Sequence, residues 1–240
     1  MHFYQNIAIK YNIMQMIQGK IIKSFVKRKG RKISEAKLLI IKEKLPEISI
    51  NENFNCDNLK KIISTNKNIN FEIGYGSGEH LLYQAKNNPN EIFIGCEPYF
   101  NGTVKLITEI IKEKINNIYI YQDDALDLLE NLPDNFLKKI FILFPDPWPK
   151  TKHHKRRIIN EKNISLFLGK LKNNATLRLA TDHQEYANWM LAKLMKEDGF
   201  TWEIDNVRDW HKKPLDWVST KYQLKALAGN NYYFFNFCKK

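Results

Sequence analysis

The amino-acid sequence predicts an α/β fold in which helices cover both faces of a doubly wound, mostly parallel sheet. Short apolar segments alternate with helical patterns from residue 69 onward, and a glycine-rich turn links the first segment to a helix. Strands that alternate with helices form parallel sheets, because a parallel pair needs a long crossover connection. The chain has 240 residues, of which 43% are hydrophobic, enough for one such domain with an extension.

Each expected element has its own pattern along the chain. Short, largely apolar segments predict five strands, at residues 69–74, 91–97, 118–121, 138–144 and 175–180. Apolar residues at helical spacing predict helices around 81–85, with a stop at 87–89, and over 100–113, 125–131 and 186–194.

The N-terminal part has a different composition. Ser34 is expected to cap a helix that stops before Pro46, and one short helix is expected around residues 59–63 within loops. Residues 20–32 carry seven Lys or Arg residues, which predict either a solvated arm or an arm that gains order on RNA. The expected division is a basic N-terminal extension and helix, 1–45, followed by one main domain, 46–240.

Bulk properties restrict the classes of function. The net charge of +12 argues for a polyanionic partner, although solvated surface lysines give the same balance. The three cysteines lack the spacing of zinc ligands, so we expect no metal and a reducing, cytoplasmic compartment. No apolar run approaches the roughly 18–20 residues of a membrane helix. The sequence leaves the oligomeric state open, a homodimer included.

The glycine-rich turn indicates a nucleotide-like ligand. Gly74, Gly76 and Gly78 alternate where the first expected strand meets a helix, and glycine lets the backbone pass close to a ligand. The loops of NAD enzymes usually place their third glycine one residue later. Glu72 would lie badly beside pyrophosphate, but it suits S-adenosylmethionine, which carries a sulfonium and an ammonium group.

Acids also end the next two expected strands. Glu97 could accept hydrogen bonds from both hydroxyls of a ribose, a role found in NAD and S-adenosylmethionine sites alike. Asp123 and Asp124 end the third strand, where a carboxylate can reach an adenine amino group. The alternative for each acid is a loop cap, which by itself does not explain acids at the same end of three successive strands.

A proline-rich loop, FPDPWPK, follows the fourth expected strand at residues 144–150. Three prolines in five residues exclude a helix or central strand and stiffen the loop. Asp146 is therefore expected to be held rigidly over the crevice, where it could position a planar base. The alternative is a structural corner. The basic run that begins at Lys150 is, taken alone, a solvated face or a phosphate patch.

The segment FPDPWPKTKHHKRR resembles the signature of the bacterial tRNA (guanine-N7-)-methyltransferase family. The segments EIGYGSG, LATDHQEYANWML and SFVKRKGRK resemble further motifs of that family. The resemblance covers roughly residues 23–237. It implies a Rossmann-like class I methyltransferase fold that uses S-adenosylmethionine to methylate N7 of a tRNA guanine, the one in the variable loop, giving 7-methylguanosine.

The resemblance also implies the roles of individual residues. It implies that the cofactor is bound by the glycine turn and by Glu72, Glu97, Asp124 and Asp146. It implies that Asp146 is also the catalytic residue. The implied substrate-binding residues are Lys150, Asp182, Thr220, Lys221, Tyr222 and Gln223. The implied RNA-contacting residues are Lys152, His153, His154, Lys155, Arg156 and Arg157.

Gln223 stands where the family usually has Glu. A carboxylate could accept from guanine N1–H and N2–H together, whereas an amide has one acceptor oxygen. Base recognition is then expected to be weaker or to depend more on Asp182. Asp182 could itself begin a variant capping box with Glu185, and both roles can coexist.

Two other functions are compatible with parts of the sequence. An exocyclic-amine methyltransferase would have [DN]-P-P-[FYW] in the proline-rich loop, which differs from the P-D-P-W found here. A non-catalytic RNA-binding module with this fold would be expected to lose the cofactor acids, which are all present.

Overall fold

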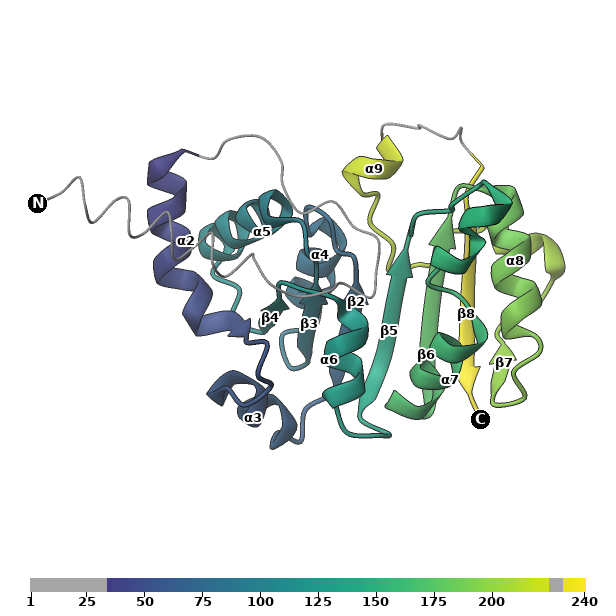
Figure 1. The fold of residues 1–240 in the computed structure, drawn as a ribbon, viewed down its shortest axis with the longest axis horizontal. Helices are drawn as coiled ribbons and strands as arrows, with labels where there is room; N and C mark the ends of the chain where they lie inside the picture. Colours follow the sequence, from purple (N-terminus) through teal and green to yellow (C-terminus); the bar gives the residue numbers. More distant parts are fainter. Residues whose placement is uncertain (1–33, 225–230) are drawn as a thin grey trace, which may run out of the picture.

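The computed structural model describes residues 34–224 and 231–240. One eight-stranded sheet runs through this part of the chain in the order β1-β4-β3-β2-β5-β6-β8-β7 (Figure 1). Its pairs are parallel except those of β8, which is antiparallel to both neighbours. The strands are β1 (Ser49–Ile50), β2 (Ile69–Ile73), β3 (Ile92–Cys96), β4 (Ile118–Tyr121), β5 (Leu137–Leu143), β6 (Leu171–Thr181), β7 (Phe200–Trp202) and β8 (Tyr233–Lys239).

The predicted α/β class is confirmed, and helices cover both faces of the sheet. The helices are α2 (Glu35–Ile48), α3 (Asp57–Ile63), α4 (Glu79–Asn87), α5 (Phe100–Glu113), α6 (Ala125–Asn131), α7 (Glu161–Lys170), α8 (Gln184–Leu194) and α9 (Lys221–Leu224), with 3₁₀ turns η1 (Thr151–Arg156) and η2 (Val207–His211). Within the described residues, no helix is long and apolar enough to cross a membrane.

The strand order reverses at β2. Along the chain, β2 is followed by β3 and β4 on one side, and β5 and β6 then add on the other side. In open α/β sheets, ligands bind at the carboxyl ends of the strands beside this reversal. The glycine-rich turn follows β2 and the proline-rich loop follows β5, so both flank the expected ligand crevice.

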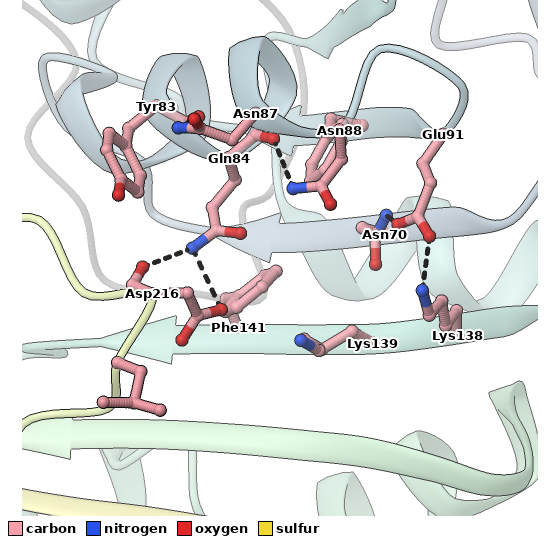
Figure 2. A pocket seen from close by; sticks show the side chains of 12 residues that line it. Asn70, Tyr83, Gln84, Asn87, Asn88, Glu91, Lys138, Lys139, Phe141 and Asp216 are labelled. Atoms are coloured by element: carbon pink, nitrogen blue, oxygen red, sulfur yellow. Dashed lines mark hydrogen bonds and ion pairs between the residues drawn. The ribbon is translucent and has the colours of Figure 1, made fainter.

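The face of the sheet under α4 is not completely filled. A cavity of about 390 Å³ lies between α4 and β5, and its lining is mostly polar (Figure 2). The Gln84 side chain of α4 reaches towards Asp216, which lies in the loop after η2 (Figure 2).

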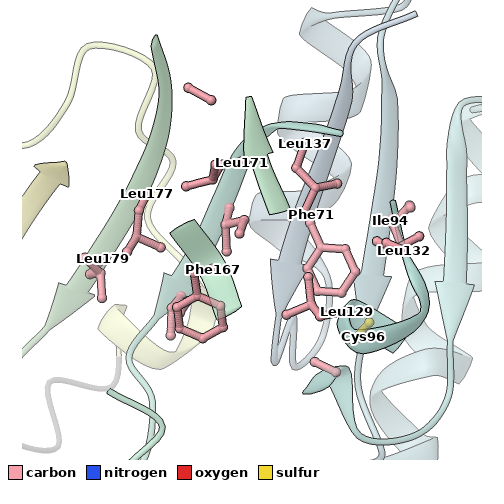
Figure 3. Close-up of a cluster of buried hydrophobic side chains, with 14 of the residues drawn as sticks. Phe71, Ile94, Cys96, Leu129, Leu132, Leu137, Phe167, Leu171, Leu177 and Leu179 are labelled. Carbon is pink, nitrogen blue, oxygen red and sulfur yellow. The ribbon is translucent and has the colours of Figure 1, made fainter. Parts of the chain in front are cut away.

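The opposite face carries the larger hydrophobic core. Figure 3 shows Phe71 of β2, Phe167 of α7 and Leu177 of β6 among its buried side chains. A second buried cluster joins α2, α4 and α5 to β3 and β4 and includes Ile41 and Ile48. These two clusters fix the positions from which the loops project.

The N-terminal prediction needs three corrections. The first helix does not stop before Pro46 but continues to Ile48, because in the last turn a proline removes only one intrahelical hydrogen bond. Ser34 is at its N-cap position, but the side chain makes no capping hydrogen bond. The short helix predicted within the following loops is confirmed, although the strand β1 was not predicted. The basic segment at residues 20–32 lies outside the described residues.

Candidate active site

The glycine-rich turn uses backbone conformations that favour glycine. Gly74, Gly76 and Gly78 have φ angles of 73°, 58° and 82°, which side chains with a Cβ rarely adopt. Gly102 of α5 lies so close to this turn that a Cβ there would approach the Gly76 carbonyl oxygen to 2.0 Å. Gly102 was not among the predicted site residues, yet its lack of a side chain lets α5 pack against the turn.

The predicted cofactor acids lie at or just beyond the carboxyl ends of β2, β3 and β4, and each has an internal partner. Glu72 Oε2 lies 2.7 Å from His80 Nδ1, and both residues are buried. The Asp124 side chain accepts from the Leu126 amide and caps α6. The preceding acid, Asp123, instead accepts from the Asp124 amide. The predicted alternative of a capping role is therefore real for Asp124.

Glu97 is hydrogen-bonded directly to the glycine-rich turn. Its two carboxylate oxygens accept from the amides of Gly76 and Tyr99, each at 2.8 Å. Burial raises the pKa of Glu97, and the two amide bonds oppose this rise only in part. A carboxylate with two oxygens still has lone pairs for further donors.

The proline-rich loop is held in an unusual conformation. Phe144 and Trp148 have φ angles of 52° and 43°, left-handed values that cost energy for bulky residues. The Phe144 amide donates to the Ala180 carbonyl at 2.8 Å, which ties the start of the loop to β6. The Asp146 side chain reaches solvent, yet partial burial raises its pKa. Burial is the main cause of the raised pKa values of Glu97 and Tyr222, and the charge of Asp146 adds to both, so Asp146 lies near these two residues.

An aromatic cluster lies beside Asp146 that the sequence analysis did not predict. The Phe144 ring contacts Tyr222 at 5.3 Å between centroids, with Trp217 at 6.1 Å and Tyr232 at 5.9 Å. Phe144 lies in the loop after β5, and the other three residues lie in the segment before β8. The helix α9 of that segment lies beyond the carboxyl end of β5 (Figure 1). The aromatic density after residue 217 is the signal that could have indicated this cluster.

Gln223 belongs to a capping box at the start of α9. The backbone N–H of Gln223 donates to Thr220 Oγ1, and the side-chain oxygen of Gln223 accepts from the backbone N–H of Thr220, both at 3.3 Å. The same oxygen accepts from Trp217 Nε1 at 2.9 Å, and the residue is buried. Gln and Glu serve equally in a capping box. The structure thus gives a folding reason why Gln can stand where the family usually has Glu.

Three further predicted substrate residues are Lys221 and Tyr222, which belong to α9, and Asp182, whose carboxylate lies near Tyr222. Burial, together with the nearby carboxylates of Asp182 and Asp146, raises the pKa of Tyr222 to about 12. The predicted capping role of Asp182 is wrong, because His183 is the N-cap of α8 and accepts from the Tyr186 amide. Lys221 is exposed, and its ammonium lies 3.4 Å from Glu79.

The basic run forms the turn η1, and its members differ in exposure. Lys150, Lys152 and Lys155 are exposed. The half-buried members pack on indole rings: His153 and Arg156 contact Trp148, and His154 contacts Trp189.

Arg157 is buried, so the prediction that it contacts RNA is wrong. It is 1% exposed, and its guanidinium binds both carboxylate oxygens of Glu185. Nε donates to the Pro147 carbonyl at 2.9 Å, and the guanidinium lies over the rings of Tyr186 and Trp189. Arg157 thereby ties the proline-rich loop to α8.

The strand order, the glycine turn at the reversal and the acids beyond three strand ends define a Rossmann-like class I methyltransferase. A solved antibiotic-related methyltransferase has the same fold, with a TM-score of 0.52 and 20% identity over 80% of this chain and 94% of that chain.

Sequence relatives give the family. The family model described as "Putative methyltransferase" matches residues 66–235. The tRNA (guanine-N(7)-)-methyltransferase of Bartonella henselae is 40% identical over 85% of this chain and 89% of its own length. That of Zymomonas mobilis subsp. mobilis is 35% identical over 88% and 91%. The chain belongs to the tRNA (guanine-N(7)-)-methyltransferase family.

Proposed function

We propose that this protein transfers a methyl group from S-adenosylmethionine to N7 of a guanine in tRNA. The observation that carries the proposal is the place of Asp146 in the proline-rich loop, two residues after Phe144 of the aromatic cluster and near Glu97. The test is transfer of tritiated methyl groups to unmodified tRNA, followed by identification of the product nucleoside. A labelled nucleoside other than 7-methylguanosine would overturn the proposal. We propose that the protein acts in the cytoplasm, where its tRNA substrate is available.

The glycine turn has room for the cofactor. A Cβ added at Gly74 or Gly76 would meet no protein atom within 4 Å, so the space beside the turn is open. Glu97 would hold the ribose, and Asp124 is the residue proposed for the adenine. Glu72 would provide negative charge near the methionine end. The bound cofactor supplies an electrophilic methyl group.

The protein residues then orient the base. Guanine N7 carries an in-plane lone pair, and no proton leaves when it forms the new bond to carbon. The carbon–sulfur bond of the cofactor would break with its electron pair left on sulfur. Positive charge develops on the guanine, where a fixed carboxylate at Asp146 would stabilise it. The rings of Phe144 and Tyr222 would hold the base by stacking, and orientation of this kind can supply up to about 7–11 kcal/mol.

Replacing Glu97 with Ala is expected to weaken cofactor binding by roughly 10- to 100-fold. Hydrogen bonds to a charged group contribute about 1.5–3 kcal/mol, and the variant also frees the Gly76 amide. Isothermal titration calorimetry measures the dissociation constant. An unchanged constant in a folded variant would contradict the assignment of Glu97.

Replacing Gln223 with Glu is expected to leave methylation within about twofold of the wild type. The carboxylate keeps the acceptor that the Thr220 amide and Trp217 use. Gln223→Ala removes that acceptor, which costs about 0.5–2 kcal/mol of local stability, and is expected to raise KM for tRNA. Steady-state kinetics on both variants measure this contrast. Equal activity of the Ala variant would show that the capping box is dispensable.

The exposed lysines of the basic run, Lys150, Lys152 and Lys155, are proposed to contact phosphates. Replacing all three with Ala should make the slope of log K against log salt shallower by about 2–3 units, since each phosphate contact contributes about 0.7–0.9. Filter binding of tRNA at several salt concentrations measures the slope. The matched control replaces Lys60, Lys61 and Lys67, exposed residues before the amino end of β2. An equal loss of slope in the control would assign the effect to net charge alone.

A further inference from the structure

A chain of polar contacts crosses the sheet face beneath the site. It begins at the cofactor acid Glu72, which is 2.7 Å from His80 Nδ1. Gln84, one turn further along α4, directs Nε2 towards His80 Nε2 at 3.4 Å and donates to the Asp216 carbonyl at 2.9 Å. Glu72, His80 and Gln84 are all at least 96% buried, so water does not replace these contacts.

The Gln84 amide nitrogen lies between His80 and Asp216. It donates to the Asp216 carbonyl at 2.9 Å and lies 3.4 Å from both Asp216 Oδ2 and His80 Nε2. The other nitrogen of the His80 ring, Nδ1, faces Glu72. Gln84 thus connects the buried Glu72–His80 pair to Asp216.

Asp216 is anchored from the opposite side as well. Its carboxylate binds the Arg178 guanidinium of β6 at 2.7 Å, and Arg178 Nε donates to Asn236 of β8 at 2.8 Å. Although burial opposes ionisation, this arginine lowers the pKa of Asp216. The residue is therefore held between α4 and the β6–β8 half of the sheet.

The segment after Asp216 leads directly to the substrate side of the site. Trp217 packs on the His80 ring at 5.8 Å and donates to the side-chain oxygen of Gln223. Gln223 caps α9, which carries Tyr222 onto Phe144. The cavity between α4 and β5 lies beside the Gln84 contact (Figure 2). Since this space is not packed with side chains, the Gln84 amide is a main link between α4 and this segment.

We propose that Gln84 is a positioning residue that fixes the substrate-binding segment 216–223 relative to the cofactor turn. Only the expected change in KM for tRNA rests on the proposed function. The geometric consequence, that residues 214–224 lose their fixed position without Gln84, holds whatever the substrate is.

The test compares Gln84→Leu with Asn87→Leu in the full chain. Both changes remove an amide of α4 that lines the same cavity, but within the described residues the Asn87 side chain bonds only the Tyr83 carbonyl of its own helix. In Gln84→Leu, amide hydrogen exchange of residues 214–224 is expected to accelerate by about tenfold. The KM for tRNA is expected to rise by about tenfold, with kcat within twofold and the cofactor dissociation constant within threefold.

The outcomes separate the two ideas. Faster exchange at 214–224 in Gln84→Leu but not in Asn87→Leu supports the positioning role, even if no methyl transfer to tRNA is detected. Unchanged exchange in that segment overturns the inference. Acceleration spread over the whole sheet also overturns it, because Gln84 would then be a general stabiliser of the fold. Gln84→Glu is the second variant: its carboxylate would repel the Asp216 carbonyl, so it should accelerate exchange in the same segment.

Discussion

Replacing Asp146 with Asn is expected to lower kcat for methyl transfer by roughly 10²–10³, the usual effect of removing one preorganised group from a site of developing charge. The amide keeps the size of the side chain but loses the negative charge that would face the guanine. Cofactor binding should change only modestly, because Glu97 and the glycine turn are intact. Single-turnover kinetics with saturating cofactor and tRNA isolate this step. Asp146→Ala should abolish transfer.

The pH dependence offers an internal check. Partial burial raises the pKa of Asp146, so the carboxylate gains its proton, and activity should fall, as the pH drops through this raised value. The Asn variant should lack this acid limb. The control is Asp205→Ala, an exposed acid in the loop after β7 at the far edge of the sheet. Near-normal turnover by the Asn variant would remove Asp146 from the mechanism.

Replacing Arg157 with Ala is expected to lower the free energy of unfolding by about 1.5–3 kcal/mol, because its charge-assisted hydrogen bonds are lost while the half-exposed Glu185 is solvated. The change leaves the Pro147 carbonyl and Glu185 without their guanidinium partner and opens a space between two aromatic rings. The proline-rich loop should lose its anchor to α8, and activity should fall with it. Urea denaturation followed by circular dichroism measures the stability change.

The neighbouring residue Lys155 is the matched control for this effect. It lies in the same basic run but is exposed, so Lys155→Ala should change the unfolding free energy by less than about 0.5 kcal/mol. If Arg157→Ala were equally mild, the burial of this guanidinium would contribute nothing to the fold. Glu185→Ala is expected to destabilise as well, because it leaves a buried charge unpaired.

The contrast between Arg157 and Lys155 marks the limit of the sequence as a predictor. A basic run does not reveal which cation faces inward, because that depends on a glutamate 28 residues away. The capping box of Gln223 is local in sequence, yet it was not predicted. The resemblance implied a role for Gln223 in binding the base and none in pairing with Thr220. Where residues are close in sequence, as in the strand, glycine turn and helix of residues 69–87, the predicted order of elements is confirmed.

The same reasoning explains which elements were predicted. Strands β2 to β5 are short apolar runs with turn residues at both ends, so their composition and length were sufficient to predict them. Strands β7 and β8 pair antiparallel, although about 30 residues separate them in the chain. Their own sequences do not indicate that β8 lies between β6 and β7. The aromatic cluster was missed for the same reason, since Phe144 and Tyr222 are 78 positions apart.

The insertion of β8 has a consequence for biosynthesis. Among the described strands, β7 pairs only with β8, and β8 also covers the open edge of β6. While the ribosome is still producing residues 203–232, β7 therefore has no partner and β6 presents a bare edge, which is a site for pairing with other chains. The strands from β1 to β6 can pair before β8 is made, but the β6–β8–β7 part of the sheet forms only after residues 233–239 have been synthesised. A premature stop codon before these residues would leave a nascent protein prone to aggregation rather than a smaller working enzyme.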